Sequence, residues 1–239
     1  DVYKRQLLNG RRKEFAACKS YEEFSTLFKT ILKDTVKEAL YYQNLFNAAR
    51  SKDTDVISSL FMPGCIESAK SATQGGAKRL SANLNMNGLM CVIDSISIIK
   101  QLVYDEKRVS AQELCTLLDN DWGDGELRAY VLNRGKFFGN NDEHSESVAI
   151  SVTNALYEII SPLSEEFGHK LLVGCFEGYN PHSTWFGAAT PATPDGRKRG
   201  DPFMIGIGQW HGLDKNGLTS LLLSVAHICL LYTSPSPRD

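Results

Sequence analysis

The chain has 239 residues, 42% of them hydrophobic, and a formal net charge of −2 at pH 7. So small a charge provides no electrostatic basis for binding nucleic acid or an anionic membrane surface, and we expect neither partner. The six cysteines are widely spread and form no C-x-x-C pair, which is typical of a reducing cytoplasm and predicts no metal site.

The two ends of the chain do not resemble a natural protein. Residues 1–6, DVYKRQ, are the translation of one frame of a common transposon sequencing adaptor, and residues 229–239 match the opposite adaptor strand. We exclude both segments from the fold, as one excludes a tag. We therefore expect residues 7–228 to be a fragment of a longer protein. Without residues 229–239 the apolar run at 221–226 is too short to cross a bilayer.

The first long element is a helix that ends near Arg50. Ser20-Tyr21-Glu22-Glu23 fits a capping box, and apolar residues recur at helical spacing from Phe24 to Leu45. A shorter segment at 56–61 follows, and Pro63-Gly64 ends it.

Residues 62–78 contain the cysteine that we expect to carry chemistry. Residues 65–85 show no clear period and predict an irregular loop, in which extended backbone would place Cys65 and Glu67 on one face of a cavity. A carboxylate disfavours a neighbouring thiolate. The pair fits a neutral thiol that exchanges a hydrogen atom beside a proton acceptor. Taken alone, the pattern is explained better by a buried cysteine next to a solvated glutamate.

The remaining elements alternate long helices with short apolar strands. Helices are predicted at 86–104, 110–120, 125–133, 141–168 and 218–228, strands at 171–176 and 203–208, and a loop at 177–202. A capping box at Ser110–Glu113 opens the second helix, and Asn141 or Asp142 caps the fourth. This pattern indicates an α/β barrel or a layered α/β fold with helices outside.

Three polar features remain, and each has an ordinary local explanation. Ala192–Arg197 contains Pro-Asp-Gly, which is strong turn chemistry. Gly75-Gly76 lacks the strand–loop–helix context of a phosphate-binding loop. The histidines have no ligand-like spacing, so we assign them no metal; they are His144, His169, His182 and His211.

Taken in chain order, the motifs resemble those of the pyruvate formate-lyase-like glycyl radical enzymes. The matching pieces are GCIE at 64–67, GGA at 75–77, Asp94-Ser95, LVYDEKR at 102–108, GNNDE at 139–143, ATPDGRK at 192–198, GLDKNG at 212–217 and SVA at 224–226. Each piece is modest, but the collinear set is specific, and ATPDGR is the sharpest.

The resemblance implies a large α/β barrel built from two half-barrels. Residues 7–228 would form a truncated part of the second half-barrel with its outer helices, with the cysteine loop at 62–78. In this family an activating enzyme that uses S-adenosylmethionine and an iron–sulfur cluster places a radical on a glycine near the C-terminus, a segment that we expect this chain to lack. We expect no cofactor bound to the chain itself, and a cytoplasmic homodimer for the full-length protein.

The resemblance also assigns roles to two residues. Cys65 maps onto the cysteine whose thiyl radical abstracts a hydrogen atom from a small-molecule substrate. Glu67 maps onto the carboxylate two residues on, which acts as a general base. The fragment alone is expected to be inactive, because the radical glycine is missing.

Three positions depart from the family pattern. Gly64 stands where pyruvate formate-lyase has a second cysteine, which disfavours acyl transfer, and Leu218 stands where the family usually has proline. Ser68–Leu84 lacks the Trp-His-Asp run of the diol-dehydratase and choline-lyase branch, which argues against the substrates of that branch. With Glu67 two residues after Cys65, we expect elimination or C–X cleavage of the dehydratase or lyase type. The alternatives are formate acetyltransferase or decarboxylase activity, and a catalytically silent homologue that keeps the barrel as a structural protein.

Overall fold

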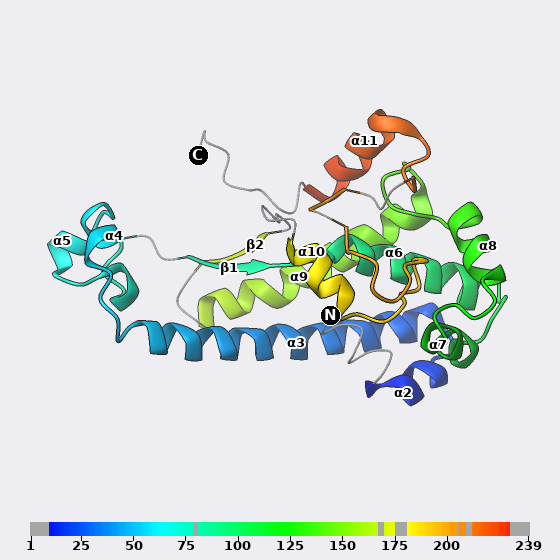
Figure 1. The fold of residues 1–239 in the computed structure, drawn as a ribbon, viewed down its shortest axis with the longest axis horizontal. Helices are drawn as coiled ribbons and strands as arrows, with labels where there is room; N and C mark the ends of the chain where they lie inside the picture. Colours follow the sequence, from blue (N-terminus) through cyan, green and yellow to red (C-terminus); the bar gives the residue numbers. More distant parts are fainter. Residues whose placement is uncertain are drawn as a thin grey trace. The chain divides into compact units, whose positions relative to one another are not determined.

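The computed structural model describes residues 10–78, 81–166, 170–174, 181–204, 206–208 and 212–229 (Figure 1). The adaptor-like residues 1–6 and 230–239 lie outside this part, as do His169, His211 and the last two residues of the strand predicted at 171–176. The chain divides into two units, which are described separately. The first comprises residues 1–32, 85–157 and 173–239, and the second comprises residues 33–84 and 158–172.

Most of the described residues are helical. The helices are α2 (Arg12–Ala17), α3 (Tyr21–Arg50), α4 (Val56–Leu60), α5 (Cys65–Ser68), α6 (Leu89–Ile99), α7 (Ala111–Asp119), α8 (Glu126–Arg134), α9 (Glu143–Glu166), α10 (Pro181–Ala188) and α11 (Gly217–Cys229). A 3-10 turn covers Ala72–Gln74, and a π-helical segment, Lys100–Asp105, follows α6 directly. The strands β1 (Ser81–Asn85) and β2 (Lys170–Gly174) pair in a two-stranded sheet.

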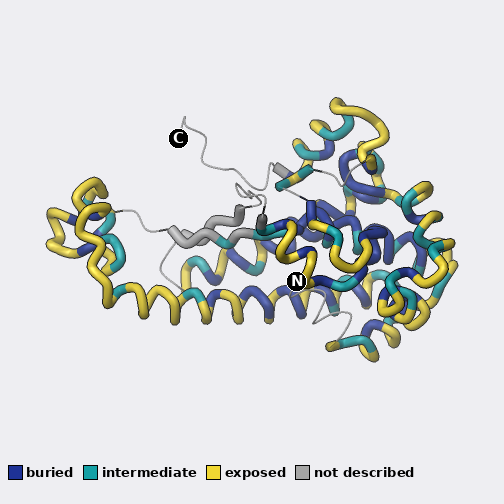
Figure 2. The backbone as a smooth tube through the Cα atoms, in the orientation of Figure 1, coloured by how far each residue is buried: buried dark blue, intermediate teal, exposed yellow. Residues whose placement is uncertain are grey.

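Helix α6 belongs to the core of the first unit. It is apolar around most of its circumference, as expected of a buried helix, and Figure 2 shows it almost entirely buried. The aromatic rings of Phe15, Phe24 and Tyr104 join α2, the first turns of α3 and the π-helical segment, with ring centroids 5.2 and 5.9 Å apart. Trp122, Phe137 and Phe138 are also fully buried.

The second unit has a small core and many exposed apolar side chains. In this unit a hydrogen bond joins the two ends of the loop at 63–78: Lys78 N–H donates to the carbonyl of Pro63 at 2.8 Å. Figure 2 shows the end of α3 and most of α4 and α5 as exposed. The exposed apolar residues are Tyr41, Tyr42, Leu45, Phe46, Val56, Ile57, Leu60, Phe61, Met62 and Ile66.

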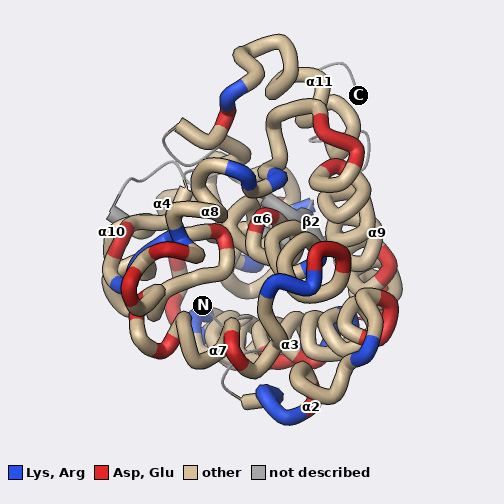
Figure 3. The backbone as a smooth tube through the Cα atoms, turned by 90° about the vertical axis from the view of Figure 1, so that its right-hand side faces the viewer, with Lys and Arg blue, Asp and Glu red and all other residues tan. Residues whose placement is uncertain are grey.

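Basic and acidic residues are interspersed along the same helices, as the colours of the backbone in Figure 3 show for the first unit. This distribution agrees with the small net charge of the sequence. Within the described residues, every helix is too short or too polar to cross a bilayer.

The helices that capping boxes and periodicity predicted are confirmed: α3, α4, α6, α7, α8, α9 and α11. The strand predicted from 171 is confirmed over its described residues as β2. Capping boxes and apolar periodicity depend on neighbouring residues, so these elements could be predicted without knowledge of tertiary contacts.

Three local predictions are wrong. Residues 65–85 contain α5, a 3-10 turn and β1 rather than a continuous loop, and residues 177–202 contain α10. A one-turn helix shows no periodicity, and α10 begins at a proline, which suits the first helical position. The described residues of 203–208 form no strand, and Gly206 turns the chain there with a φ of 62°. Among the described residues, the expected α/β character is thus present as one two-stranded sheet among helices.

Candidate functional site

Cys65 is the first residue of α5 and lies in the second unit. Its side chain is buried, with 4% of its surface exposed. Gly64 caps the helix with a φ of 97°, and a Cβ at this glycine would lie 2.7 Å from the backbone nitrogen of Lys78. The close approach of the loop to itself therefore requires glycine before Cys65.

Glu67 caps the short helix that Cys65 begins. Its side chain is exposed, and its Oε2 accepts a hydrogen bond from Gly64 N–H at 3.0 Å. Residues two apart on a helix lie ~200° apart around its axis. The extended backbone expected to place Cys65 and Glu67 on one face is thus replaced by a capped helical turn.

In the first unit, a stripe of polar side chains binds the main chain of residues 134–138, which join α8 to α9. Asp94, Ser97 and Gln101 recur at spacings of three and four and lie on one face of the helix. All three are buried. Ser97 Oγ donates to the carbonyl of Lys136 at 2.6 Å, and Lys136 N–H donates to Gln101 Oε1 at 3.0 Å. The stripe thus satisfies backbone groups that no secondary structure pairs.

Asp94 adds a buried acid to this stripe. Its Oδ1 accepts from Phe138 N–H at 2.8 Å, and its buried Oδ2 has no hydrogen-bond partner among the described residues. Burial raises the pKa of Asp94 well above its usual range. The hydrogen bond from Phe138 N–H lowers this pKa, and the nearby charge of Asp195 raises it further. Burial, and then Asp195, likewise raise the pKa of the Cys91 thiol. Both shifts favour the neutral form of the group.

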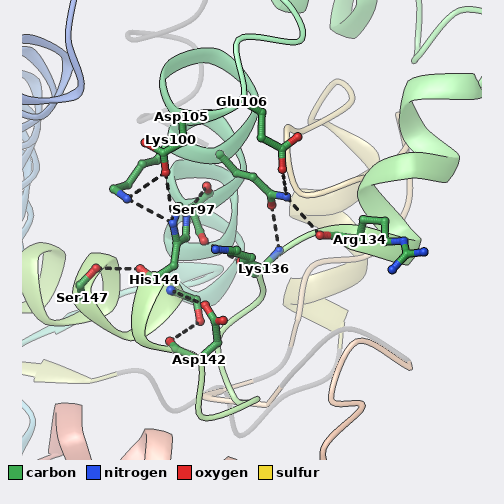
Figure 4. Close-up of polar contacts among 11 residues, drawn as sticks. Ser97, Lys100, Asp105, Glu106, Arg134, Lys136, Asp142, His144 and Ser147 are labelled. Atoms are coloured by element: carbon green, nitrogen blue, oxygen red, sulfur yellow. Dashed lines mark hydrogen bonds and ion pairs between the residues drawn. The ribbon is translucent and has the colours of Figure 1, made fainter.

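The π-helical segment pairs side chains that are five residues apart. Glu106 N–H donates to the carbonyl of Gln101 at 2.8 Å. Lys100 Nζ lies 3.1 Å from Asp105 Oδ2, and Gln101 Nε2 donates to Glu106 Oε1 at 2.7 Å (Figure 4). Single π turns inside helices occur frequently at functional sites, so this segment is a candidate site in its own right.

His144, from the first turn of α9, inserts against the π-helical segment (Figure 4). Its side chain is 8% exposed. Nε2 lies 3.1 Å from the carbonyl oxygen of Ser97, and Nδ1 lies 3.1 Å from Lys100 Nζ and 3.4 Å from Asp105 Oδ2. Burial lowers the pKa of His144, as do the charges of Lys100 and Lys136, while the Ser97 carbonyl and Asp105 work against this.

The spacing of the histidines, which predicted no metal site, gives no sign of this cluster. The usable signal was polar residues at helical spacing, Asp94, Ser97 and Gln101, on an otherwise apolar helix. Among the described residues no group of His, Cys, Asp and Glu is arranged to hold a metal ion.

The GNNDE motif at 139–143 forms the turn into α9. Asp142 is the N-cap, since its Oδ1 accepts from Ser145 N–H at 3.2 Å. Asn140 pairs twice with Asn216: its Oδ1 accepts from Asn216 N–H at 3.2 Å, and its carbonyl accepts from Asn216 Nδ2 at 2.8 Å. The motif therefore ties the start of α9 to the segment before α11.

A second tie joins α9 to α11 through Glu146. Its carboxylate accepts from Ser224 Oγ at 2.8 Å and lies 2.8 Å from His227 Nδ1. Ser224 Oγ also accepts from Asn141 N–H at 3.1 Å. Ser224 is fully buried, so α11 turns a polar side chain inward and several leucines outward.

The ATPDGR motif is a closed turn, as its local sequence predicted. Gly196 N–H donates to the carbonyl of Thr193 at 3.1 Å, and Thr193 N–H donates to the carbonyl of Arg197 at 2.9 Å. Gly196 has a φ of 94°, which explains the glycine. Trp122 Nε1 donates to the carbonyl of Arg197 at 3.3 Å, and Arg128 Nε donates to that of Gly196 at 2.8 Å.

The Arg197 side chain is almost fully buried, with 1% of its surface exposed. Its guanidinium donates to the carbonyl oxygens of Asp201 at 2.6 Å and Thr190 at 3.1 Å, and to that of Pro191. It also lies 4.8 Å from the centroid of the Phe203 ring. These contacts hold the end of α10 against residues 201–203, so the arginine acts as a structural cross-link.

Comparison with known proteins places these features in a family. The family model described as "Pyruvate formate lyase-like" matches residues 2–177. The isethionate sulfite-lyase of Desulfovibrio desulfuricans is 33% identical over 145 residues, which are 57% of this chain and 16% of that protein. The 4-hydroxyphenylacetate decarboxylase glycyl radical subunit of Clostridioides difficile is 26% identical over 231 residues, which are 86% of this chain and 25% of that protein.

A solved structure agrees with the sequence matches. The glycerol-bound form of the B12-independent glycerol dehydratase from Clostridium butyricum superposes with a TM-score of 0.82 at 26% identity. The superposition covers 92% of this chain and 28% of that one. The chain thus spans about a quarter or less of the length of these relatives. With the family model matched over most of its length, the chain belongs to the pyruvate formate lyase-like family of glycyl radical enzymes.

Proposed function

We propose that the complete protein is a glycyl radical enzyme of the lyase or dehydratase type. The observation that carries the proposal is the close superposition on a glycerol dehydratase over nearly the whole chain. The sulfite-lyase match points to the same class of reaction, in which a group leaves the carbon next to a substrate radical. We place the chain in the second half-barrel of a cytoplasmic homodimer.

The proposed reaction needs no net oxidant. A glycyl radical, installed by an activating enzyme with S-adenosylmethionine and an iron–sulfur cluster, supplies the radical that a cysteine passes to substrate. The substrate radical loses its leaving group, and the product radical takes the hydrogen atom back. The protein has to bind a small organic substrate, exclude water and hold a base near the departing proton.

The test uses the complete protein, produced without oxygen together with its activating enzyme. We expect a glycyl radical doublet in electron paramagnetic resonance and the release of water or sulfite from one of three substrates: glycerol, trans-4-hydroxyproline or isethionate. Carbon dioxide from 4-hydroxyphenylacetate would favour the decarboxylase alternative, and acetyl transfer to coenzyme A would favour the formate acetyltransferase. A missing doublet would indicate a silent homologue. Residues 1–239 alone should give neither signal nor turnover.

The roles of Cys65 as thiyl carrier and Glu67 as base stay predictions. In this chain, which spans about a quarter of its relatives' length, Glu67 accepts from Gly64 N–H and is exposed. The similarity of GCIE at 64–67 to the family motif supports the thiyl role of Cys65. The alternative for a buried cysteine at the first turn of a short helix is a packing role.

We therefore expect Cys65→Ser in the activated complete enzyme to abolish turnover while the glycyl radical signal persists. Cys115→Ser is the matched control, because Cys115 is another buried cysteine, at 1% exposure in α7. Cys115→Ser should lose only some thermal stability and keep its turnover. Retained turnover in Cys65→Ser, or loss of the radical doublet together with turnover, would make Cys65 a packing residue.

A further inference from the structure

The contacts of His144 define which ring nitrogen carries its proton. The Ser97 carbonyl oxygen, 3.1 Å from Nε2, can only accept a hydrogen bond. The Lys100 ammonium, 3.1 Å from Nδ1, can only donate one. Both partners are satisfied when the ring is neutral, with its proton on Nε2 and a lone pair on Nδ1.

The position of Asp105 conflicts with this neutral ring. Its Oδ2 lies 3.4 Å from Nδ1, so two acceptor atoms face each other. Lys100 Nζ lies 3.1 Å from each of these atoms and separates them electrostatically. The ammonium therefore holds together two groups that would otherwise repel.

A proton on Nδ1 reverses both interactions. The nitrogen becomes a donor that Asp105 can accept, and the imidazolium repels the ammonium of Lys100 at 3.1 Å. Lys100 and a proton thus compete for the same place between His144 and Asp105. Because the Lys100 side chain is 23% exposed, it has a route to solvent.

We propose that His144 is a proton-operated latch on the π-helical segment Lys100–Asp105: protonation exchanges Lys100 for Asp105 as the partner of its Nδ1. The exchange breaks the Lys100–Asp105 pair, one of the two side-chain pairs that link residues five apart across the π turn. The segment then opens more readily, while the Gln101–Glu106 pair remains.

The surrounding groups determine the direction of the switch. Lys136, from residues 134–138, adds positive charge, and Tyr21 of α3 lies with its ring centroid 5.5 Å from Lys100 Nζ. Burial raises the pKa of Tyr21 to about 12, so this phenol stays neutral. Burial and both lysines lower the pKa of His144. The latch is consequently closed at neutral pH and opens as the pH falls below the ordinary histidine pKa.

The sign of the stability effect follows from the same shift. The unfolded chain binds the histidine proton at a higher pH than the folded chain does. The contribution of neutral His144 to the free energy of unfolding is therefore fully present above the ordinary histidine pKa. It is lost as the pH falls toward the lowered folded-state pKa of His144.

The experiment measures hydrogen exchange of residues 100–106 in the 239-residue chain by mass spectrometry, at pH 7.5 and pH 5, corrected for the intrinsic rates. We expect faster exchange at pH 5 in the native chain and equal rates in His144→Gln. The matched control is His227→Gln, since His227 is a half-exposed histidine paired with Glu146, and it should keep the acid effect. An unchanged acid effect in His144→Gln would overturn the proposal.

A second measurement keeps the test decisive if His144→Gln fails to fold. Imidazole resonances are titrated in the native chain, in Lys100→Met and in Asp105→Asn. We expect Lys100→Met to raise the pKa of His144, because the competitor is gone, and Asp105→Asn to lower it. Shifts of the opposite sign, or none in either variant, would show that Lys100 and Asp105 do not exchange.

Discussion

At the residue scale, the core of the first unit contains ionisable groups whose protonation depends on their surroundings. Asp94 is completely buried, has one N–H donor and lies near the charge of Asp195. A carboxylic acid in such a place is more stable with its proton on. The sequence shows that residue 94 is an aspartate, but not the burial and the neighbouring charge that favour its protonated form.

Asp94→Asn tests this conclusion. The folded-state pKa of Asp94 is raised, so its contribution to stability falls as the pH rises from the unfolded-state pKa toward the folded-state value. The amide copies the neutral acid and can still accept from Phe138. We expect Asn to raise the free energy of unfolding at pH 8 and to flatten its pH dependence, measured by urea denaturation.

Asp94→Ala provides the contrast, because it leaves the Phe138 N–H without its acceptor. We expect the free energy of unfolding to fall by about 1–3 kcal/mol at both pH 5 and pH 8. Equal destabilisation by Asn and Ala at pH 8 would mean that Asp94 is ionised in the folded chain.

Arg197→Lys tests the buried cross-link at the ATPDGR turn. A lysine cannot reproduce the planar fork that reaches several carbonyl oxygens at once. We expect a loss of about 1.5–3 kcal/mol, the range for hydrogen bonds to charged groups, in the free energy of unfolding. Arg199→Lys, two residues on and exposed, should change it little. A similar loss from both substitutions would argue against the cross-link.

At the element scale, local chemistry places the helix ends well. At α7, Ser110 Oγ accepts from Glu113 N–H at 3.2 Å, and Glu113 Oε2 accepts from Ser110 N–H at 2.8 Å. The capping box predicted from the sequence is therefore confirmed. The π-helical segment Lys100–Asp105 was not predictable in this way, because its side-chain pairs and its contact with His144 are tertiary.

Ser110→Ala should destabilise α7 by about 1 kcal/mol, since one orphan amide loses its acceptor. Thermal unfolding followed by circular dichroism measures the change. Thr116→Ala on the exposed face of the same helix is the control and should be neutral or slightly stabilising, because alanine has the higher helix propensity. A neutral Ser110→Ala would show that tertiary packing alone maintains this helix end.

At the scale of the whole molecule, the second unit presents a large apolar surface on α4 and the turn that follows it. Ile57 is 75% exposed and Phe61 82% exposed. Apolar patches of this kind promote association in water. We expect the 239-residue chain to self-associate with rising concentration in analytical ultracentrifugation.

The double variant Ile57→Ser, Phe61→Ser should shift that association to higher concentration. Lys52→Ser, close by in sequence and already polar, is the control and should leave it unchanged. Association that is insensitive to the double variant would place the contact on another surface.

The sequence by itself determined the longer helices and the family. Capping boxes and apolar periodicity are local signals that the fold confirms, whereas α5 and α10 lack such signals. The family inferred from the order of the motifs is confirmed by the family model over residues 2–177. Only the tertiary structure decided where side chains point and which groups carry protons. Glu67 binds Gly64 N–H because a single capped turn replaces extended backbone, and His144 meets Lys100 across 44 residues of sequence. Such contacts depend on packing between distant segments, which no local pattern encodes.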